Sequence, residues 1–162
     1  MQYNYQKYVE LLKYDDLLRK KNKFLKDENK LKYLELKNYS LQINEHLHWS
    51  NKEEYLQLIE EFLSFKINGK TFESKFCNMV EAIEKKCLLL TKNYEILKNI
   101  KPSSISFEFA KWISEIYLCC DEFYPDFDEK DPPDFPFAKN EEDFRNAVAD
   151  IFPQIQKYLN EE

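Results

Sequence analysis

Glycine is almost missing from this chain. Only Gly69 occurs among 162 residues, and the first of the six prolines is Pro102. Glycine and proline supply the tight turns of β proteins, so a chain this poor in both is badly suited to a turn-rich β fold. Apolar residues make up 43% of the chain and aromatic residues 16%, which favours a packed core over disorder. We therefore expect an all-α protein.

The first 49 residues carry a repeating apolar pattern without a strong turn signal. The repeat of seven residues runs in two columns, Leu11, Leu18 and Leu25 beside Leu17, Phe24 and Leu31. This spacing predicts either one long helix or a helical hairpin. Its apolar stripe is expected to dock on the chain's own core or to pair with a second chain. We treat residues 1–49 as an N-terminal helical extension.

Residues 50–162 carry four further helical patterns, which predict an antiparallel four-helix bundle. The patterns cover residues 50–63, 71–90, 104–123 and 140–159. Ser50, followed three positions later by Glu53, predicts a capping box at the first helix. Asn68 and Gly69 predict a tight turn with positive φ before the second.

Charge is divided unevenly between the two regions. Residues 1–50 hold ten Lys/Arg and seven Asp/Glu, a net charge of +3, while residues 51–162 hold 14 and 23, a net charge of −9. The basic cluster between Arg19 and Lys26 is flanked by carboxylates that would repel phosphates, so we interpret it as a solvated face and expect no direct contact with nucleic acid.

The most acidic part of the chain follows the third bundle helix. We call residues 119–134, CCDEFYPDFDEKDPPD, the acidic segment; it holds seven carboxylates against Lys130 alone. Prolines limit the freedom of its backbone, and such a concentration of negative charge steers a basic partner. A solvated loop is the alternative, but aromatic residues are interleaved with the charges, which favours packing or contact.

Motifs for catalysis are missing. One glycine cannot build a phosphate-binding loop, and no zinc spacing or Ser/His/Asp pattern of the usual kind occurs. The four cysteines form no metal or disulfide framework, and the acidic segment lacks the spacing of a calcium loop. We therefore expect that the protein is not an enzyme and that it binds no metal ion and no cofactor. We also expect a soluble protein, because no apolar run is long enough to cross a membrane and no signal peptide is present.

Residues 55–159 resemble the colicin D immunity protein family, the bacterial self-protective colicin-like immunity proteins. The resemblance rests on three stretches in the same order, LIEEFLSFKINGKTFESKF from Leu58 to Phe76, DEFYPD from Asp121 to Asp126, and Glu141–Leu159. It implies a small four-helix bundle that neutralises a toxin cutting the anticodon loop of tRNA. Members of the family present carboxylates where the toxin expects RNA phosphates.

The resemblance also implies which residues would bind the toxin. Asp121 and Asp126 would mimic phosphates, supported by Glu122, Asp128 and Glu129, while Phe123 and Pro125 would fix the backbone. The partner would be a basic nuclease domain.

The extension of 49 residues has no counterpart in the short bacterial proteins of this family. Similar extended proteins occur in algal plastid genomes, so we expect either the bacterial cytoplasm or the plastid (chloroplast) stroma. An organellar interaction or assembly protein, with the N-terminal helix and the bundle as a docking module, is therefore the alternative function. An assembly protein of this kind could also self-associate through the N-terminal helix.

Overall fold

The chain folds into helices. The computed structural model describes residues 2–128, 130 and 133–161, and within them it contains eight helices and no strand. The all-α prediction is confirmed. In chain order the helices are α1 (Tyr5–Arg19), α2 (Leu25–Glu28), α3 (Lys30–Ser50), α4 (Lys52–Leu63), α5 (Gly69–Leu90), α6 (Tyr94–Leu97), α7 (Ser104–Asp121) and α8 (Glu141–Asn160).

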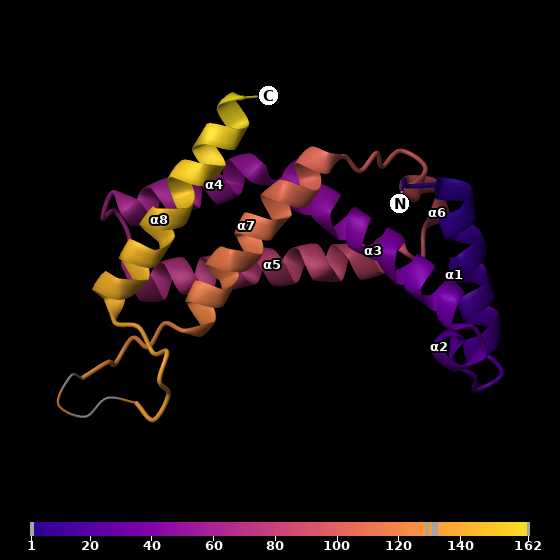
Figure 1. Ribbon diagram of the computed structural model, residues 1–162, viewed down its shortest axis with the longest axis horizontal. Helices are drawn as coiled ribbons and strands as arrows, with labels where there is room; N and C mark the ends of the chain where they lie inside the picture. Colours follow the sequence, from indigo (N-terminus) through magenta and orange to yellow (C-terminus); the bar gives the residue numbers. More distant parts are fainter. Residues whose placement is uncertain (1, 129, 131–132, 162) are drawn as a thin grey trace.

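The first 50 residues form two main helices rather than one. Asn22 adopts a left-handed φ of 56° in the turn after α1, and Asn29 then caps α3 by accepting a hydrogen bond from the Lys32 amide. Both asparagines suit these positions, because their short polar side chains tolerate the left-handed region and satisfy free helix amides. Of the two alternatives, the structure forms the helical hairpin (Figure 1).

One of the two leucine columns faces inward. Leu11, Leu18 and Leu25 are buried, whereas Leu17, Phe24 and Leu31 are exposed. The buried side of the hairpin joins the end of α5 and α6 in one apolar cluster, and the Tyr8 hydroxyl bonds Ser40 Oγ at 3.1 Å inside it. This cluster comprises Tyr8, Leu11, Tyr39, Ile43, Leu47, Ile83, Leu90, Leu97 and Ile100.

The larger core lies among α4, α5, α7 and α8. Phenylalanine rings fill its centre, with Phe62 stacked on Phe72 at a centroid distance of 4.3 Å. Helix α3, which we assigned to the extension, packs against both α5 and α7, and Trp49 near its end meets Phe109 at 5.5 Å. The two long helices α3 and α5 therefore run from one apolar cluster to the other (Figure 1).

The predicted capping box at Ser50 is wrong. Ser50 is the last residue of α3, and its hydroxyl donates to the His46 carbonyl at 2.8 Å. Helix α4 starts at Lys52 after Asn51. The Ser-x-x-Glu pattern is local, whereas the packing of the residues just before Ser50 keeps α3 helical to its end.

The predicted positive φ at Asn68–Gly69 is also wrong. Asn68 is the N-cap of α5, and its side chain accepts from the Thr71 amide at 2.9 Å. The left-handed residue is Phe65 instead, with a φ of 60°. Helix α4 ends in a Schellman motif, with bonds of 3.0 Å from the Lys66 amide to the Glu61 carbonyl and from the Phe65 amide to the Phe62 carbonyl.

Phe65 holds a conformation that usually belongs to glycine. The buried Arg145 guanidinium lies over the Phe62 and Phe65 rings, 4.1 Å and 4.2 Å from their centroids, and donates to the Phe62 carbonyl. Glu141 pairs with the same guanidinium at 2.6 Å. This cation–π contact offsets the backbone strain and joins the end of α4 to α8.

A buried hydrogen bond links α3 to α4, which are separated only by Asn51. His48 is 6% exposed, and its Nδ1 lies 2.9 Å from the hydroxyl of the fully buried Tyr55. Burial lowers the pKa of His48 from 6.5 to about 4, so the imidazole is neutral in the folded protein at neutral pH.

This lowered pKa predicts acid sensitivity. The unfolded chain takes up a proton near the ordinary pKa of 6.5 but the folded chain only near 4, so stability is lost as pH falls through this window. Between about pH 7 and about pH 5 we expect His48 to account for a loss of about 2 kcal/mol in the free energy of unfolding. Urea unfolding at each pH measures it.

The His48→Gln variant serves as the comparison, because glutamine keeps a hydrogen-bonding side chain but does not titrate. Its stability should depend less on pH by that same amount. His46 and Glu45, whose pKa values burial lowers and raises respectively, are unchanged in both proteins and cancel. Equal slopes for the two proteins would contradict the assignment.

Candidate partner-binding surface

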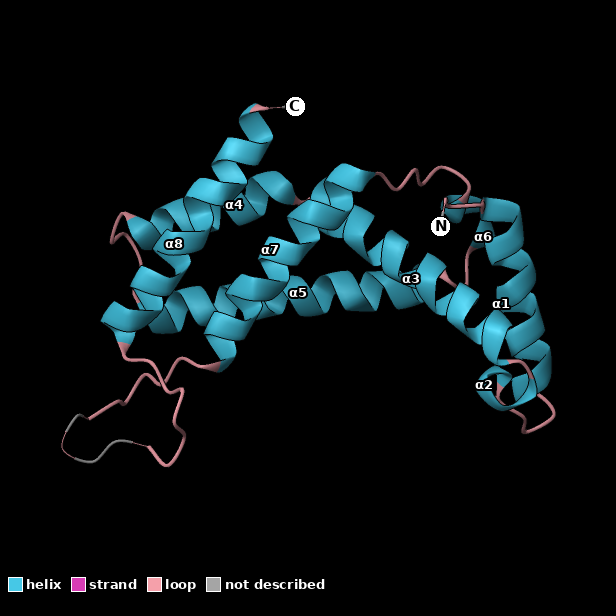
Figure 2. Cartoon of the chain, viewed as in Figure 1, coloured by secondary structure: helices cyan, strands magenta, loops and turns pink. Residues whose placement is uncertain are grey.

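The acidic segment lies largely in the long connection between α7 and α8. Helix α7 ends at Asp121 and α8 begins at Glu141, with Asn140 capping it by accepting from the Asp143 amide at 2.8 Å. The connection projects beyond the ends of the helices that flank it (Figure 2). Most of its described residues between 124 and 137 are exposed.

The two ends of the connection are fastened together. The Tyr124 amide donates to the Lys139 carbonyl at 2.9 Å, and the Lys139 amide donates to the Glu122 carbonyl at 2.7 Å. The Lys139 ammonium also forms an ion pair with the Glu122 carboxylate. Backbone and side-chain contacts therefore close the connection at its base.

Phe123 anchors this base to the core. Its ring stacks on Phe144 of α8, with centroids 4.7 Å apart and planes 21° apart. The tip of the ring lies against Gly69 of α5, where an added Cβ would come within 2.8 Å of the Phe123 ring. Gly69 is thus needed for the close approach of an aromatic ring and not for a positive φ.

The carboxylates expected to bind a partner fall into two groups. Asp121, Asp126 and Asp128 are exposed and form no ion pair with any described residue. Glu122 is partly buried and already paired with Lys139. Glu129 lies outside the described residues. The free negative charge therefore comes from the three aspartates, while Glu122 holds the base together.

The turn at Pro125 sets the positions of these aspartates. Pro125 and Asp126 are exposed, and the Phe127 amide donates to the Tyr124 carbonyl at 3.2 Å behind them. Asp128 accepts from the Lys130 amide at 2.9 Å. Proline fixes φ in this turn and limits the conformations that the neighbouring carboxylate can take.

Aromatic side chains are exposed beside the carboxylates. Tyr124 is 46% exposed, Phe135 47% and Phe137 64%, and the last two meet edge to face with centroids 5.9 Å apart. Aromatic residues at the surface are enriched where proteins bind one another. The connection thus combines negative charge with apolar contact area.

Three residues of this surface escaped the sequence-based expectation. Gly69 receives the Phe123 ring, Phe144 stacks on it, and Lys139 closes the base. A signal existed only for Lys139, the first lysine after the prolines that follow the acidic residues. The roles of Gly69 and Phe144 depend on contacts between elements far apart in the chain.

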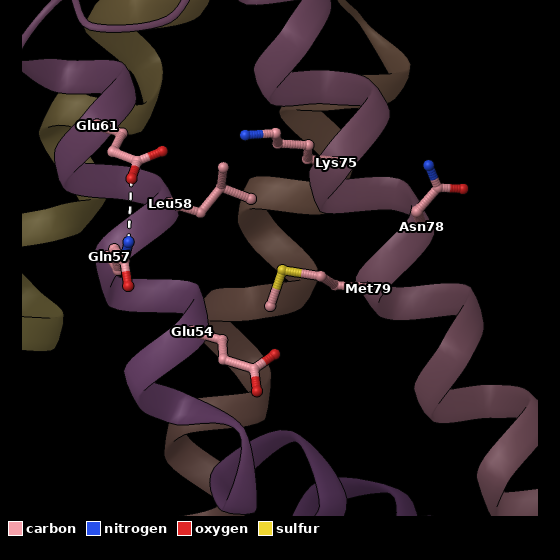
Figure 3. A pocket seen from close by; sticks show the side chains of 7 residues that line it. All are labelled: Glu54, Gln57, Leu58, Glu61, Lys75, Asn78 and Met79. Carbon is pink, nitrogen blue, oxygen red and sulfur yellow. Dashed lines mark hydrogen bonds between the residues drawn. The ribbon is translucent and has the colours of Figure 1, made fainter.

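A shallow groove of about 380 Å³ runs between α4 and α5. Glu54, Gln57 and Glu61 line one wall, Lys75 and Asn78 the other, with Leu58 and Met79 between them (Figure 3). The Gln57 amide donates to the Glu61 carboxylate at 3.0 Å. These lining residues include no cysteine, serine or histidine.

Clustered metal ligands and long apolar helices are both absent among the described residues. There, no group of three or more His, Cys, Asp or Glu side chains is placed to hold a metal ion. None of the helices formed by the same residues is both long and apolar enough to span a bilayer.

Comparison with known proteins identifies no relative of this chain. No family model, curated protein or solved structure matches this chain.

The anchoring role of Phe123 can be tested by truncation. Phe123→Ala removes the stack on Phe144 and leaves space beside Gly69, so we expect the free energy of unfolding to fall by about 2 kcal/mol. Phe137→Ala removes an exposed ring of the same connection and should change it by less than about 0.5 kcal/mol. Urea unfolding compares the two, and equal effects would contradict the anchor.

Proposed function

We propose that this protein is a non-catalytic, immunity-type binding protein that neutralises a basic, tRNA-cleaving nuclease toxin. It would do so by occupying the toxin's RNA-binding cleft with the carboxylates of the α7–α8 connection. The observation that carries the proposal is the group of exposed aspartates, Asp121 at the end of α7 and Asp126 and Asp128 on a connection fastened to the core at its base.

Unpaired carboxylates are suited to a cleft that binds phosphates. A nuclease that cuts RNA holds the phosphate backbone with Lys and Arg side chains, and a protein carboxylate can accept the same hydrogen bonds. Because none of the three aspartates is neutralised by a described lysine or arginine, their charge is available to a partner. Residues 51–162 carry a net charge of −9, which adds a long-range attraction.

Anchoring reduces the cost of binding. A freely moving acidic loop would lose much conformational entropy on entering a cleft. Here the Phe123 stack and the Glu122–Lys139 pair already hold the base of the connection. The exposed Tyr124 and Phe137 rings would contribute apolar contact, which charge alone does not supply.

The resemblance to the colicin D immunity family points to the same function. The acidic DEFYPD stretch includes two of the three exposed aspartates and the Phe123 anchor. A bacterial cytoplasm or a plastid stroma remains the proposed compartment, since a toxin of this class acts on tRNA there.

The proposal is tested by capture and inhibition. The tagged protein is used to recover partners from extract of the native cell at low salt, and the captured fraction is assayed for tRNA cleavage with and without added protein. We expect one basic nuclease, inhibited by the protein, with affinity falling steeply as salt rises.

Two charge reversals locate the surface. Asp121→Lys with Asp126→Lys should weaken binding by at least about a hundredfold, since two charge contacts become repulsive. Glu10→Lys with Glu95→Lys changes the net charge equally, on α1 and α6 at the other end of the molecule, and should cost less than about threefold. Equal binding by both double variants, or a captured partner without nuclease activity, would contradict the proposal.

A second candidate is an interaction or assembly protein that docks through its N-terminal helices. Leu31, Leu34 and Leu41 lie on one face of α3 and are 80%, 50% and 52% exposed. Three large apolar side chains on one helix face indicate a contact surface more often than an ordinary solvated one. Self-association through this face is the simplest form of the candidate.

Sedimentation velocity tests that form. A dimer that Leu31→Glu with Leu34→Glu converts to monomer would support it. The matched control is Leu88→Glu with Leu89→Glu on α5, where both leucines are 66% exposed. A monomeric native protein, or the same loss in the control, would contradict it.

A further inference from the structure

A separate pocket lies between α3, α5 and α7. Its volume is about 280 Å³, close to the lower end of ordinary ligand pockets and suited to a group the size of one side chain. Five polar side chains line it together with apolar ones such as Ile113. The polar residues are Asn44, His48, Glu84, Ser114 and Tyr117.

His48 provides a buried hydrogen-bonding group in this pocket. Only 6% of the residue is exposed, and its Nδ1 is bonded to the Tyr55 hydroxyl. Within the described residues Nε2 has no hydrogen-bond partner, yet no unpartnered side-chain nitrogen or oxygen is sealed from solvent. Nε2 therefore keeps some exposed surface, and His48 is one of the residues that line the pocket.

The pocket is negatively charged. Glu84 is the only carboxylate that lines it and no lysine or arginine does, while burial lowers the pKa of His48 to about 4. The pKa of the Tyr117 hydroxyl is raised chiefly by Asp121, with further contributions from Cys77, burial, Glu84 and Glu81, although Asp121 and Glu81 do not line the pocket. Lys85 pairs with Glu81 at 3.0 Å and offsets that charge, but it does not line the pocket.

We propose that this pocket binds one small organic cation, an alkylguanidinium or alkylammonium group. The Glu84 carboxylate would pair with the charge, the Tyr117 ring and the apolar wall would cover the alkyl chain, and Asn44 and His48 would supply hydrogen bonds. The inference does not depend on the proposed function, since none of these side chains belongs to the α7–α8 connection.

Two sources share this chemistry, a free amine and an arginine side chain of a protein. The probes are agmatine for the first and Nα-acetyl-arginine amide for the second, each titrated into the full-length, isotope-labelled protein and followed by NMR. Nα-acetyl-citrulline amide has nearly the shape of the arginine probe without its charge. We expect saturable shifts at Asn44, Ser114 and the His48 ring nitrogens with a cationic probe and affinity about tenfold lower with the citrulline probe.

Variants separate charge from shape. Glu84→Gln should lower the affinity about tenfold, and Glu95→Gln, an exposed carboxylate on α6, should leave it unchanged. Ser114→Phe fills the pocket from an exposed position without changing charge and should abolish the shifts, with circular dichroism confirming the fold.

Each outcome decides the inference. Binding of agmatine alone assigns a free amine, and binding of the arginine probe alone or of both assigns a site open to a protein side chain. No saturable shift with either cationic probe, equal affinity for the citrulline probe, or unchanged affinity in Glu84→Gln would overturn it.

Discussion

A run of phenylalanine rings holds this molecule together. Phe62 stacks on Phe72, Phe72 contacts Phe144 at 5.7 Å, and Phe144 stacks on Phe123. These four rings come from α4, α5, α8 and the α7–α8 connection. Aromatic pairs contribute both buried apolar area and a preferred geometry, so the run fixes the relative positions of these elements as well as stabilising them.

The second constraint is the length of α3 and α5. Each extends beyond the larger core and contributes to the smaller cluster under α1 and α6. The hairpin is thereby packed on elements that also serve the bundle. His48 is buried near the end of α3. Its hydrogen bond to Tyr55 links α3, which contributes to the smaller cluster, to α4, which contributes to the larger core.

The sequence alone predicted the structural features that depend on local residue patterns. Spacing identified the apolar faces of the bundle helices, and residues such as Tyr55, Phe62 and Phe109 are buried as their positions in these patterns require. It could not choose between the leucine columns of Leu11 and Leu17, because both columns have the same period and only tertiary packing distinguishes them. Ser50 shows the same limit, since a capping pattern is overridden where the preceding helix is held by its neighbours.

The acidic segment, too, could be predicted from the sequence only in part. Composition was enough to single it out, and its interleaved aromatic residues favour packing or contact over a solvated loop. Glu122 is paired because Lys139, 17 residues later in the chain, lies beside it where the two ends of the connection meet. Asp126 has no such partner among the described residues. Distant partners of this kind leave no periodic trace in a sequence.

The close approach of Phe123 to Gly69 ties the surface to the interior. A substitution that enlarges residue 69 moves the ring, and a substitution at Phe144 removes its support, so either change displaces the carboxylates that follow. Core and surface therefore cannot evolve independently here. During divergence, the exposed aspartates and aromatics beyond the anchor could be exchanged without disturbing the packing, while the glycine and the stacked rings would stay under selection for folding.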